Sequence, residues 1–265
     1  VMRPLRLGNA PQLRNADVLC TIAMAVGDRL LHSSALAIVP PEGSAWEPIQ
    51  EVRHCLRDAG LCRWPPHINL VYPFVEPLYY RQFAERARPV LEGVPPFHVS
   101  LDEFGTFGTE KRGVVWLRPR VVPTADGTSD VLQDLHARLC EAVPNMHRWK
   151  RPFVPHLTVT HTRSHEEAAL IAADLQRDWA PVTFPVETLC VLSRQSAVHA
   201  FELSWQLPLG DAATEPSPVG LRFASMPRVE DVPWAAERRR QLQHKLRAEA
   251  VRRQRVRECD AQTDA

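Results

Sequence analysis

Apolar and polar residues follow two different periods along residues 33–210, which indicates a mixture of strands and helices. The apolar run 35–39 predicts a short buried strand, and residues 46–59 carry apolar side chains at helical spacing on one face. The same two periods predict further elements: strands over 67–72, 97–104, 114–117, 154–160, 186–192 and 200–207, and helices over 77–91, 129–143 and 164–179. The last of these helices begins with a capping box, Ser164 and Glu167. This order predicts one folded domain over 33–210.

The periodic pattern stops on both sides of this domain. Residues 1–32 are interpreted as an N-terminal extension, because Pro and Gly interrupt any helix in the first sixteen positions. Residues 211–233 are rich in Pro, Ala, Ser and Thr and are interpreted as a Pro-rich linker that lies along a surface or stays mobile. Residues 234–265 are expected to form a basic C-terminal helix whose apolar stripe is too thin to be buried on its own.

Composition narrows the class of protein. A chain of 265 residues with 45% apolar side chains can build a sizeable core. The longest apolar run, residues 18–27, is about half the length of a membrane-spanning helix, so we expect no transmembrane segment. The six cysteines form no CxxC pair, which argues against a structural zinc module and against a disulfide framework. We therefore expect an intracellular protein, with cytoplasm, nucleus and mitochondrion left open.

The charge is unevenly distributed along the chain. Residues 235–258 contain nine Lys or Arg and three Glu, a sum of +6, whereas the whole chain carries only +1. The other residues therefore sum to −5 (1 − 6). A basic segment on an acidic body favours a polyanionic partner such as an RNA or a ribonucleoprotein. A solvated helix without any partner is the alternative.

A short histidine motif occurs twice. Residues 66–71 read Pro-His-Ile-Asn-Leu-Val and residues 155–160 read Pro-His-Leu-Thr-Val-Thr. Each copy follows a predicted strand and a predicted helix, which indicates a duplicated strand-helix-strand unit. Two such units can pair their histidine strands about a pseudo-twofold axis, and this would bring His67 and His156 face to face.

The strand period assigns directions to these side chains. His67 and Asn69 point to one face of their strand, and His156 and Thr158 do the same in the second copy. Two opposed imidazoles can divide acid and base work near neutral pH, which suits cleavage of a phosphoester without metal or other cofactor. The Asn69 amide and the Thr158 hydroxyl are then candidate donors to the phosphate oxygens. The other histidines, among them His161, have no repeat and are interpreted as structural or solvent-facing.

With its flanks, the motif resembles a known family. Residues 63–74, Arg-Trp-Pro-Pro-His-Ile-Asn-Leu-Val-Tyr-Pro-Phe, and residues 155–159, Pro-His-Leu-Thr-Val, resemble the paired His-apolar-Thr/Ser-apolar tetrapeptides of the 2H phosphoesterase superfamily. This superfamily includes the 2′-5′ RNA ligase-like and cyclic-phosphodiesterase proteins. Residues 189–194 and 201–205 resemble its closing hairpin, so that the resemblance covers about residues 33–210.

The resemblance implies an α+β fold with two pseudo-symmetric antiparallel-sheet lobes around a central cleft and helices outside. It also implies metal-independent action on 2′,3′-cyclic phosphates or 2′-5′ linkages of RNA and nucleotides, with His67 and His156 as the catalytic pair. Asn69 departs from the family, which usually has Thr or Ser there, and this departure moves the donor outward. Arg151 and Tyr72 near the motifs are candidate substrate-binding residues.

Two hypotheses about function follow. The first is a 2H-type phosphodiesterase acting on RNA or nucleotides, which the intact histidine pair favours. The alternative is an RNA-binding or structural subunit of a ribonucleoprotein, docked by residues 235–258 and the two extensions, with weak or no catalysis. Asn69 and the extensions favour that alternative.

Overall fold

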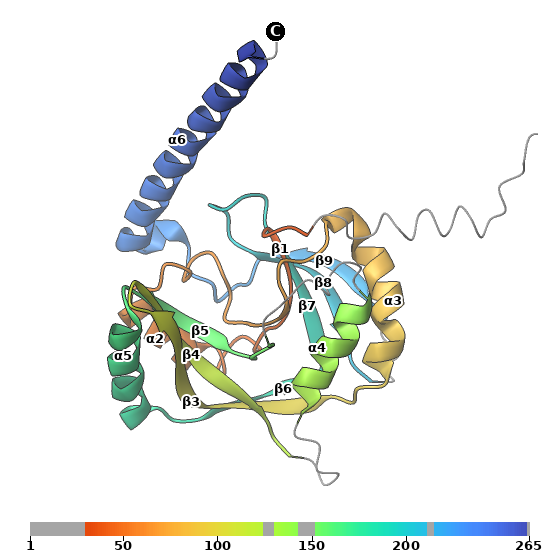
Figure 1. The fold of residues 1–265 in the computed structure, drawn as a ribbon. Helices are drawn as coiled ribbons and strands as arrows, with labels where there is room; N and C mark the ends of the chain where they lie inside the picture. The colour runs from red at the N-terminus through yellow and green to blue at the C-terminus, as the bar shows by residue number, and fades with distance from the viewer. Residues whose placement is uncertain (1–29, 124–129, 143–151, 211–214, 264–265) are drawn as a thin grey trace, which may run out of the picture.

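Nine antiparallel strands form one sheet in the computed structural model, which describes residues 30–123, 130–142, 152–210 and 215–263, with side chains to residue 254. The strand order is β6-β3-β4-β5-β2-β1-β7-β8-β9 (Figure 1). The strands are β1 (Ser34–Ile38), β2 (Ile68–Val71), β3 (Phe97–Thr109), β4 (Arg112–Val121), β5 (Leu157–Thr162), β6 (Val182–Val186), β7 (Thr188–Ser193), β8 (Glu202–Pro208) and β9 (Ser217–Leu221). The helices are α2 (Glu47–Cys55), α3 (Tyr80–Glu92), α4 (Val131–Ala142), α5 (His165–Asp178) and α6 (Pro233–Thr263), with short 3-10 turns at η1 (Pro77–Tyr79) and η3 (Val229–Asp231).

The sheet consists of two halves that meet at its centre. The units β1-α2-β2 and β4-α4-β5 have the same order of elements, and β2 lies beside β5. The central contact is the antiparallel pair of Ile68 with Leu157. One hydrophobic core extends over both halves, since it contains Leu36 and Ile68 from one and Val115 and Leu157 from the other. The α+β fold with two pseudo-symmetric antiparallel halves is therefore confirmed.

Each half sends its helix across to the histidine strand of the other half. Helix α2 contacts β5, and helix α4 contacts β2. In Figure 1, α2 and α5 lie at one flank of the sheet and α3 and α4 at the other. His136 of α4 fixes one of these crossings, because its Nδ1 donates to the carbonyl oxygen of Leu70 in β2 over 2.7 Å. The two halves are thus interlocked through their helices as well as through the sheet.

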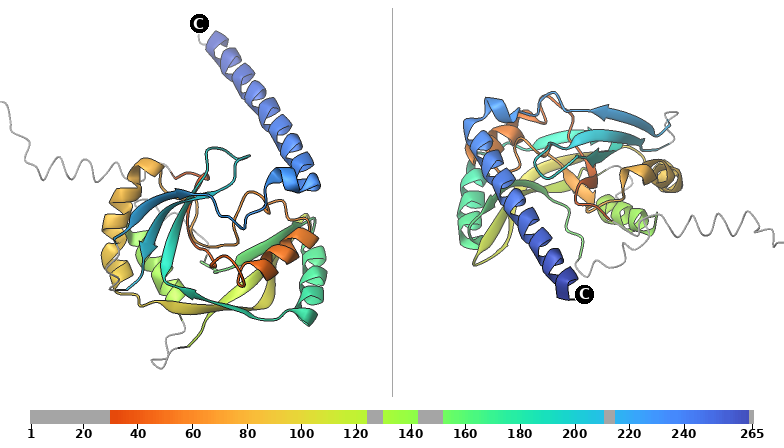
Figure 2. Two further views of the ribbon diagram at one scale, coloured as in Figure 1. Left: turned by 180° about the vertical axis from the view of Figure 1, so that it is seen from behind. Right: turned by 90° about the horizontal axis from the view of Figure 1, so that it is seen from above.

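Residues expected as a linker contribute structure to the domain. Strand β9 pairs with β8 at the edge of the sheet. Phe223 and Met226, which follow it, are buried in a cluster with Trp46 and Phe201. The chain then turns through η3 into α6, whose far part projects from the domain in Figure 1 and in the left view of Figure 2.

The start of α5 agrees with the capping box predicted from the sequence. Ser164 has an extended backbone, and its hydroxyl accepts a hydrogen bond from the Glu167 N–H over 3.1 Å. We expect Ser164→Ala to lower the free energy of unfolding by about 1 kcal/mol, because this helical N–H loses its partner. Urea denaturation measures the change. The variant Ser164→Asp, which keeps an acceptor, should stay near wild type, and an equal loss in both variants would contradict the capping role.

Candidate active site

The two motif histidines stand next to each other at the centre of the sheet. Each immediately precedes its strand, and the two strands pair through their first residues, Ile68 and Leu157. An antiparallel register sets the residue before each of these opposite the residue after the other. The opposed pairs are His67 with Thr158 and Asn69 with His156. The four side chains, hereafter the motif face, therefore lie on one side of the sheet as close cross-strand neighbours.

Both histidine rings are oriented by the same hydrogen bond. His67 Nδ1 lies 2.8 Å from the carbonyl oxygen of Pro65, and His156 Nδ1 lies 2.8 Å from that of Val154. A carbonyl oxygen only accepts, so each ring carries its proton on Nδ1 and leaves Nε2 as the reactive nitrogen. The duplication in the sequence thus extends to the orientation and tautomer of the two rings.

Asn69 contacts the histidine of its own motif. Its Nδ2 donates to His67 Nε2 over 3.1 Å, and its Oδ1 is buried without a hydrogen-bond partner in the described structure. A Thr or Ser at this position has a shorter side chain, and its hydroxyl cannot fill the same space. The Asn69 amide, the candidate phosphate donor, therefore donates to the lone pair on His67 Nε2. Thr158, on the opposite strand, is half-buried.

A stack of aromatic rings backs His67. The Trp64 ring lies parallel to His67 with centroids 4.5 Å apart, and Phe201 stacks on the other side of Trp64 at 3.6 Å. The Arg194 guanidinium lies over Phe201 at 4.4 Å and over Trp64 at 5.6 Å. This places an arginine that the sequence did not single out two rings from His67.

His156 is enclosed differently, by rings that meet it edge-on. Phe107 lies 5.1 Å from His156 and Trp116 lies 6.1 Å from it, measured between ring centroids. The indole of Trp116 lies flat against Gly105, where a Cβ would come within 2.4 Å of the ring. Only glycine leaves room for the indole at that point, so Gly105 sets the wall beside His156.

Burial favours the neutral form of both histidines. It lowers the pKa of His67 to about 4, with smaller contributions from the Arg53 and His156 charges that outweigh the charge of Asp58. Burial also lowers the pKa of His156, and the charge of His161 adds to this. The shift of the pKa is large for His67, so the two rings differ in their affinity for a proton.

A bulge in β5 brings a third histidine to the motif face. One extra residue of β5 lies between two neighbouring cross-strand pairs with β4. The pairs are Trp116 with Thr158, Val115 with Thr160 and Val114 with His161. Trp116 and Val114 share a face of β4, so their partners also share one. His161 is 65% exposed, as expected for a solvent-facing residue, but it lies on the side of the catalytic candidates.

A buried ion pair stands behind His161. Arg53 Nη2 lies 2.8 Å from Asp58 Oδ2, both side chains are only 3% exposed, and Arg53 also donates to the Trp64 carbonyl over 3.0 Å. Burial alone would raise the pKa of Asp58, but the charge and the hydrogen bonds of Arg53, together with the nearby polar groups of His161 and Gly60, lower it. The Asp58 carboxylate reaches to 4.0 Å from His161 Nδ1. The ion pair therefore supports the segment before His67 and the third histidine together.

Of the two candidate substrate-binding residues, the structure describes only Tyr72. Tyr72 meets Trp64 edge-on at 5.5 Å between ring centroids, and its hydroxyl donates to the His32 carbonyl over 3.2 Å. Tyr72 thus packs against Trp64, the ring that stacks on His67. Arg151 lies outside the described residues.

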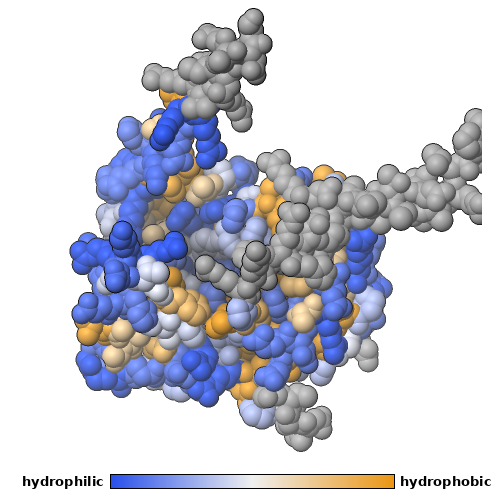
Figure 3. All heavy atoms as spheres, viewed as in Figure 1, coloured by the Kyte–Doolittle hydropathy of each residue, from blue (hydrophilic) through white to orange (hydrophobic). Residues whose placement is uncertain are grey.

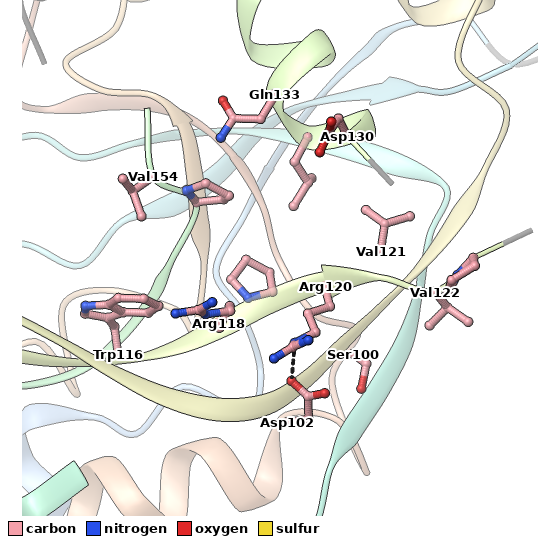
Figure 4. A pocket seen from close by; sticks show the side chains of 14 residues that line it. Ser100, Asp102, Trp116, Arg118, Arg120, Val121, Val122, Asp130, Gln133 and Val154 are labelled. Carbon is pink, nitrogen blue, oxygen red and sulfur yellow. Dashed lines mark ion pairs between the residues drawn. The ribbon is translucent and has the colours of Figure 1, made fainter. Parts of the chain in front are cut away.

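A cavity of about 670 Å³ opens beside Trp116 and Pro155, and His156 is not among the residues that line it. Trp116 and Val154 lie at one end of it and Val122 and Asp130 at the other (Figure 4). Arg118 lines the cavity and lies over the Trp116 ring at 5.8 Å. A planar group bound in this cavity would therefore find an indole and a guanidinium in its wall.

The described residues contain no group of three or more His, Cys, Asp or Glu side chains arranged to hold a metal ion. Among the helices of the described part of the chain, none is long and apolar enough to cross a membrane.

Comparison with known proteins places the chain. OB1230 of Oceanobacillus iheyensis, provisionally named as a phosphoesterase, is 27% identical over 134 residues, which cover 49% of this chain and 74% of OB1230. Escherichia coli LigT in complex with 3′-AMP is 17% identical over 71% of this chain and 98% of LigT, with a TM-score of 0.42. Usb1 of Kluyveromyces marxianus with uridine monophosphate is 11% identical over 67% of this chain and 99% of Usb1, with a TM-score of 0.43. Residues 41–197, more than half of the chain and both histidine motifs, match the 2′-5′ RNA ligase superfamily, and the chain therefore belongs to this family of 2H phosphoesterases.

Proposed function

We propose that the chain is a metal-independent phosphodiesterase that acts on 2′,3′-cyclic phosphates or 2′-5′ linkages of RNA or nucleotides, with His67 and His156 as its catalytic pair. The supporting observation is the matched pair of Nδ1 hydrogen bonds to Pro65 and Val154. They leave two Nε2 atoms on one face of the sheet with different affinities for a proton.

The two histidines have different roles in the proposed reaction. His67 has the strongly lowered pKa and is unprotonated, so its Nε2 takes the proton of the attacking water. The water oxygen forms the new bond to phosphorus, and one bridging P–O bond breaks. His156, in its protonated form, gives the Nε2 proton to the leaving ribose oxygen, and Thr158 donates to a non-bridging oxygen. Proton exchange with solvent then restores both rings.

Asn69 must release His67 before this reaction. Its amide donates to the same Nε2 that would take the proton. A bound phosphate offers the amide a charged acceptor, which is stronger than a neutral ring nitrogen. Substrate binding would thus draw the Asn69 donor to the phosphate and free the base, which reconciles the observed contact with a role in phosphate binding.

The substrate assay tests the proposal directly. We expect the full chain to turn over a 2′,3′-cyclic nucleotide or a 2′-5′ dinucleotide in the presence of EDTA. Product analysis shows which P–O bond is cut and therefore which of the two linkages is the substrate. A folded protein that turns over neither compound would overturn the proposal.

The pH dependence of kcat/KM should be bell-shaped and centred on the acidic side of pH 6.5. The rate falls as the pH drops through the His67 pKa of about 4, because the base becomes protonated. It also falls as the pH rises through the lowered pKa of His156, because the acid loses its proton. Rate measurements from pH 3 to 9 on wild type check both limbs.

An Asn69→Ser variant tests whether the acid limb of this pH profile belongs to His67. Removing the amide donor from neutral His67 raises the pKa of that ring, so only the acid limb should move to higher pH. An acid limb that is identical in both proteins would show that it belongs to another group.

A second candidate function is an RNA-binding or structural subunit of a ribonucleoprotein. The contact of Asn69 with His67 Nε2 and the basic helix α6 favour it. The structure also defines a clean truncation for testing it. Deleting residues 211–265 would remove β9 and the buried Phe223, whereas deleting 247–265 keeps them. A shortened chain that keeps its turnover but no longer binds RNA would assign α6 to binding rather than catalysis.

A further inference from the structure

The first turns of helix α6 are docked on the domain. Four residues are buried together at this junction, two from each side: Leu61, Cys62, Val232 and Ala235. Arg238 Nη1 also donates to the Arg57 carbonyl oxygen over 2.9 Å. Figure 3 shows hydrophilic surface along the part of the helix that projects from the domain. The junction is therefore the part of α6 whose position relative to the domain is fixed.

A groove of about 330 Å³, which we call the junction groove, lies between α6 and the domain. Its wall on α6 consists of residues three or four positions apart, which share one face of the helix: Trp234, Arg238, Leu242 and Lys245. From Trp234 to Lys245 this face extends about 16 Å along the helix axis. The opposite wall belongs to the domain and includes Ala59, Arg63 and Val198. The groove is thus elongated, which suits a stretch of polypeptide better than a compact ligand.

The wall of the junction groove combines apolar side chains with positive charge. Val198, Trp234 and Leu242 form much of its apolar part. Four cationic side chains and no carboxylate line it: Arg63, Arg238, Arg239 and Lys245. No ion pair among the described residues includes any of these four cations. An acidic occupant would therefore meet positive charge that the described part of the chain leaves without an opposite charge.

Arg63 holds the domain wall of the junction groove in place. Its guanidinium donates to the carbonyl oxygens of Ala59 over 3.2 Å and Ala197 over 3.1 Å, and so joins two segments that line the groove. Burial lowers the pKa of Arg63, and the charge of Arg238 adds to this against the opposing charge of Asp58. An anionic group in the groove would stabilise the charged guanidinium. The wall is preformed, so that binding requires little further ordering of the domain.

Carboxylates limit the positive stretch at both ends of the junction groove. Arg239 also lines a second hollow of about 270 Å³, whose wall mixes arginines with Glu202 and Glu230. At the other end, Glu249 follows Lys245 four positions later on the same face of α6. The wall without carboxylates is therefore short. This favours a short acidic peptide over an RNA strand, whose charge repeats along its whole length.

We propose that the junction groove binds a short acidic peptide segment of a partner protein, with apolar side chains against Leu242 and carboxylates against Arg63 and Lys245. Apolar anchors supply most of the affinity of an interface, and paired charges around them supply orientation and specificity. Neither His67 nor His156 lines the groove. The groove is thus an interaction surface that does not depend on the proposed reaction.

Two matched double variants of the full chain test the inference. Leu242→Ser/Lys245→Gln removes one apolar side chain and one charge from the junction groove. Arg247→Gln/Val251→Ser makes the same two kinds of change on the opposite face of α6. At 3.6 residues per turn, Val251 is rotated by about 180° from Leu242, and Arg247 by about 160° from Lys245. None of the four side chains makes a docking contact of α6, and thermal denaturation should show that both variants keep the stability of wild type.

The probe is a library of random peptides of about twelve residues, long enough to span the groove even as a helix, displayed on phage and selected on the wild-type chain. We expect the enriched sequences to combine Asp or Glu with large apolar residues. In fluorescence anisotropy, an enriched peptide should bind about tenfold more weakly to the groove variant and equally well to the control. Of the single variants, only Lys245→Gln should reduce the salt dependence of binding, because Leu242→Ser removes no charge.

Three outcomes would overturn the inference. The first is a selection that enriches no peptide, or only peptides without acidic residues. The second is equal binding of the enriched peptide by wild type and the groove variant, which would place its site elsewhere on the chain. The third is displacement of the peptide by an oligouridylate at lower concentration than by the unlabelled peptide, which would make RNA the occupant.

Discussion

Replacing His156 or His67 by alanine should lower kcat by roughly 10²- to 10⁴-fold, the usual contribution of a general acid or base. His156→Ala removes the donor to the leaving oxygen, and His67→Ala removes the acceptor for the proton of water. Both variants keep the paired residues Ile68 and Leu157, so the sheet should persist. Steady-state turnover of the substrate identified in EDTA measures the effect.

The variant His98→Ala is the control, because His98 is exposed on β3 outside the motif face. The double variant of His67 and His156 should be little slower than either single variant, since both residues act in one reaction step. Variants that are folded and fully active would exclude the two-histidine reaction. Two independent, multiplying losses would indicate that the histidines act in separate steps.

The largest loss of stability is expected from Asp58→Asn, about 3–5 kcal/mol in the free energy of unfolding. Arg53 is only 3% exposed, and the substitution leaves its charge buried without the opposite charge. Urea denaturation measures the loss. Asp174→Asn is the control, because the ion pair of Asp174 with Arg177 is 69% exposed on both sides and should contribute less than about 1 kcal/mol.

The same ion pair predicts how stability depends on pH. Asp58 has a lower pKa in the folded chain than in the unfolded chain, where it is near 3.9. Its contribution is therefore complete above the unfolded pKa and is lost as the pH falls through the folded pKa. Wild type should lose more stability than Asp58→Asn when the pH is lowered below about 4. Parallel losses in the two proteins would contradict the assignment to Asp58.

Local patterns predicted the elements well and the ends of the sheet less well. The sequence did not predict strand β6 (Val182–Val186), because Pro185 lacks the backbone N–H that a strand donates to its neighbour. Strand β6 lies at the edge of the sheet, where one missing N–H donor is tolerated. Strand β9 was missed because Pro218 and Gly220 make Ser217–Leu221 read as linker. Strand β6 depends on β3, which is distant in sequence, and β9 depends on the loop that returns it beside β8; a local period reports neither pairing.

The candidate site shows the same limit. The repeat placed His67 and His156 together, because a duplicated unit carries its geometry in its sequence. The approach of Asp58 to His161 depends on a bulge in β5, which shifts the strand period by one residue. The contact of Asn69 with His67 depends on the rotamer of one side chain. Neither a bulge nor a rotamer leaves a pattern of hydrophobic and polar residues.

The contacts of α2 with β5 and of α4 with β2 bear on the entropy of substrate binding. Each helix contacts the histidine strand of the other half, so the halves cannot rotate apart without breaking both contacts. The separation of the two rings is therefore fixed when the chain folds, and the loss of conformational freedom occurs then rather than on binding. Differences in affinity among substrates should consequently reflect the flexibility of the substrates themselves.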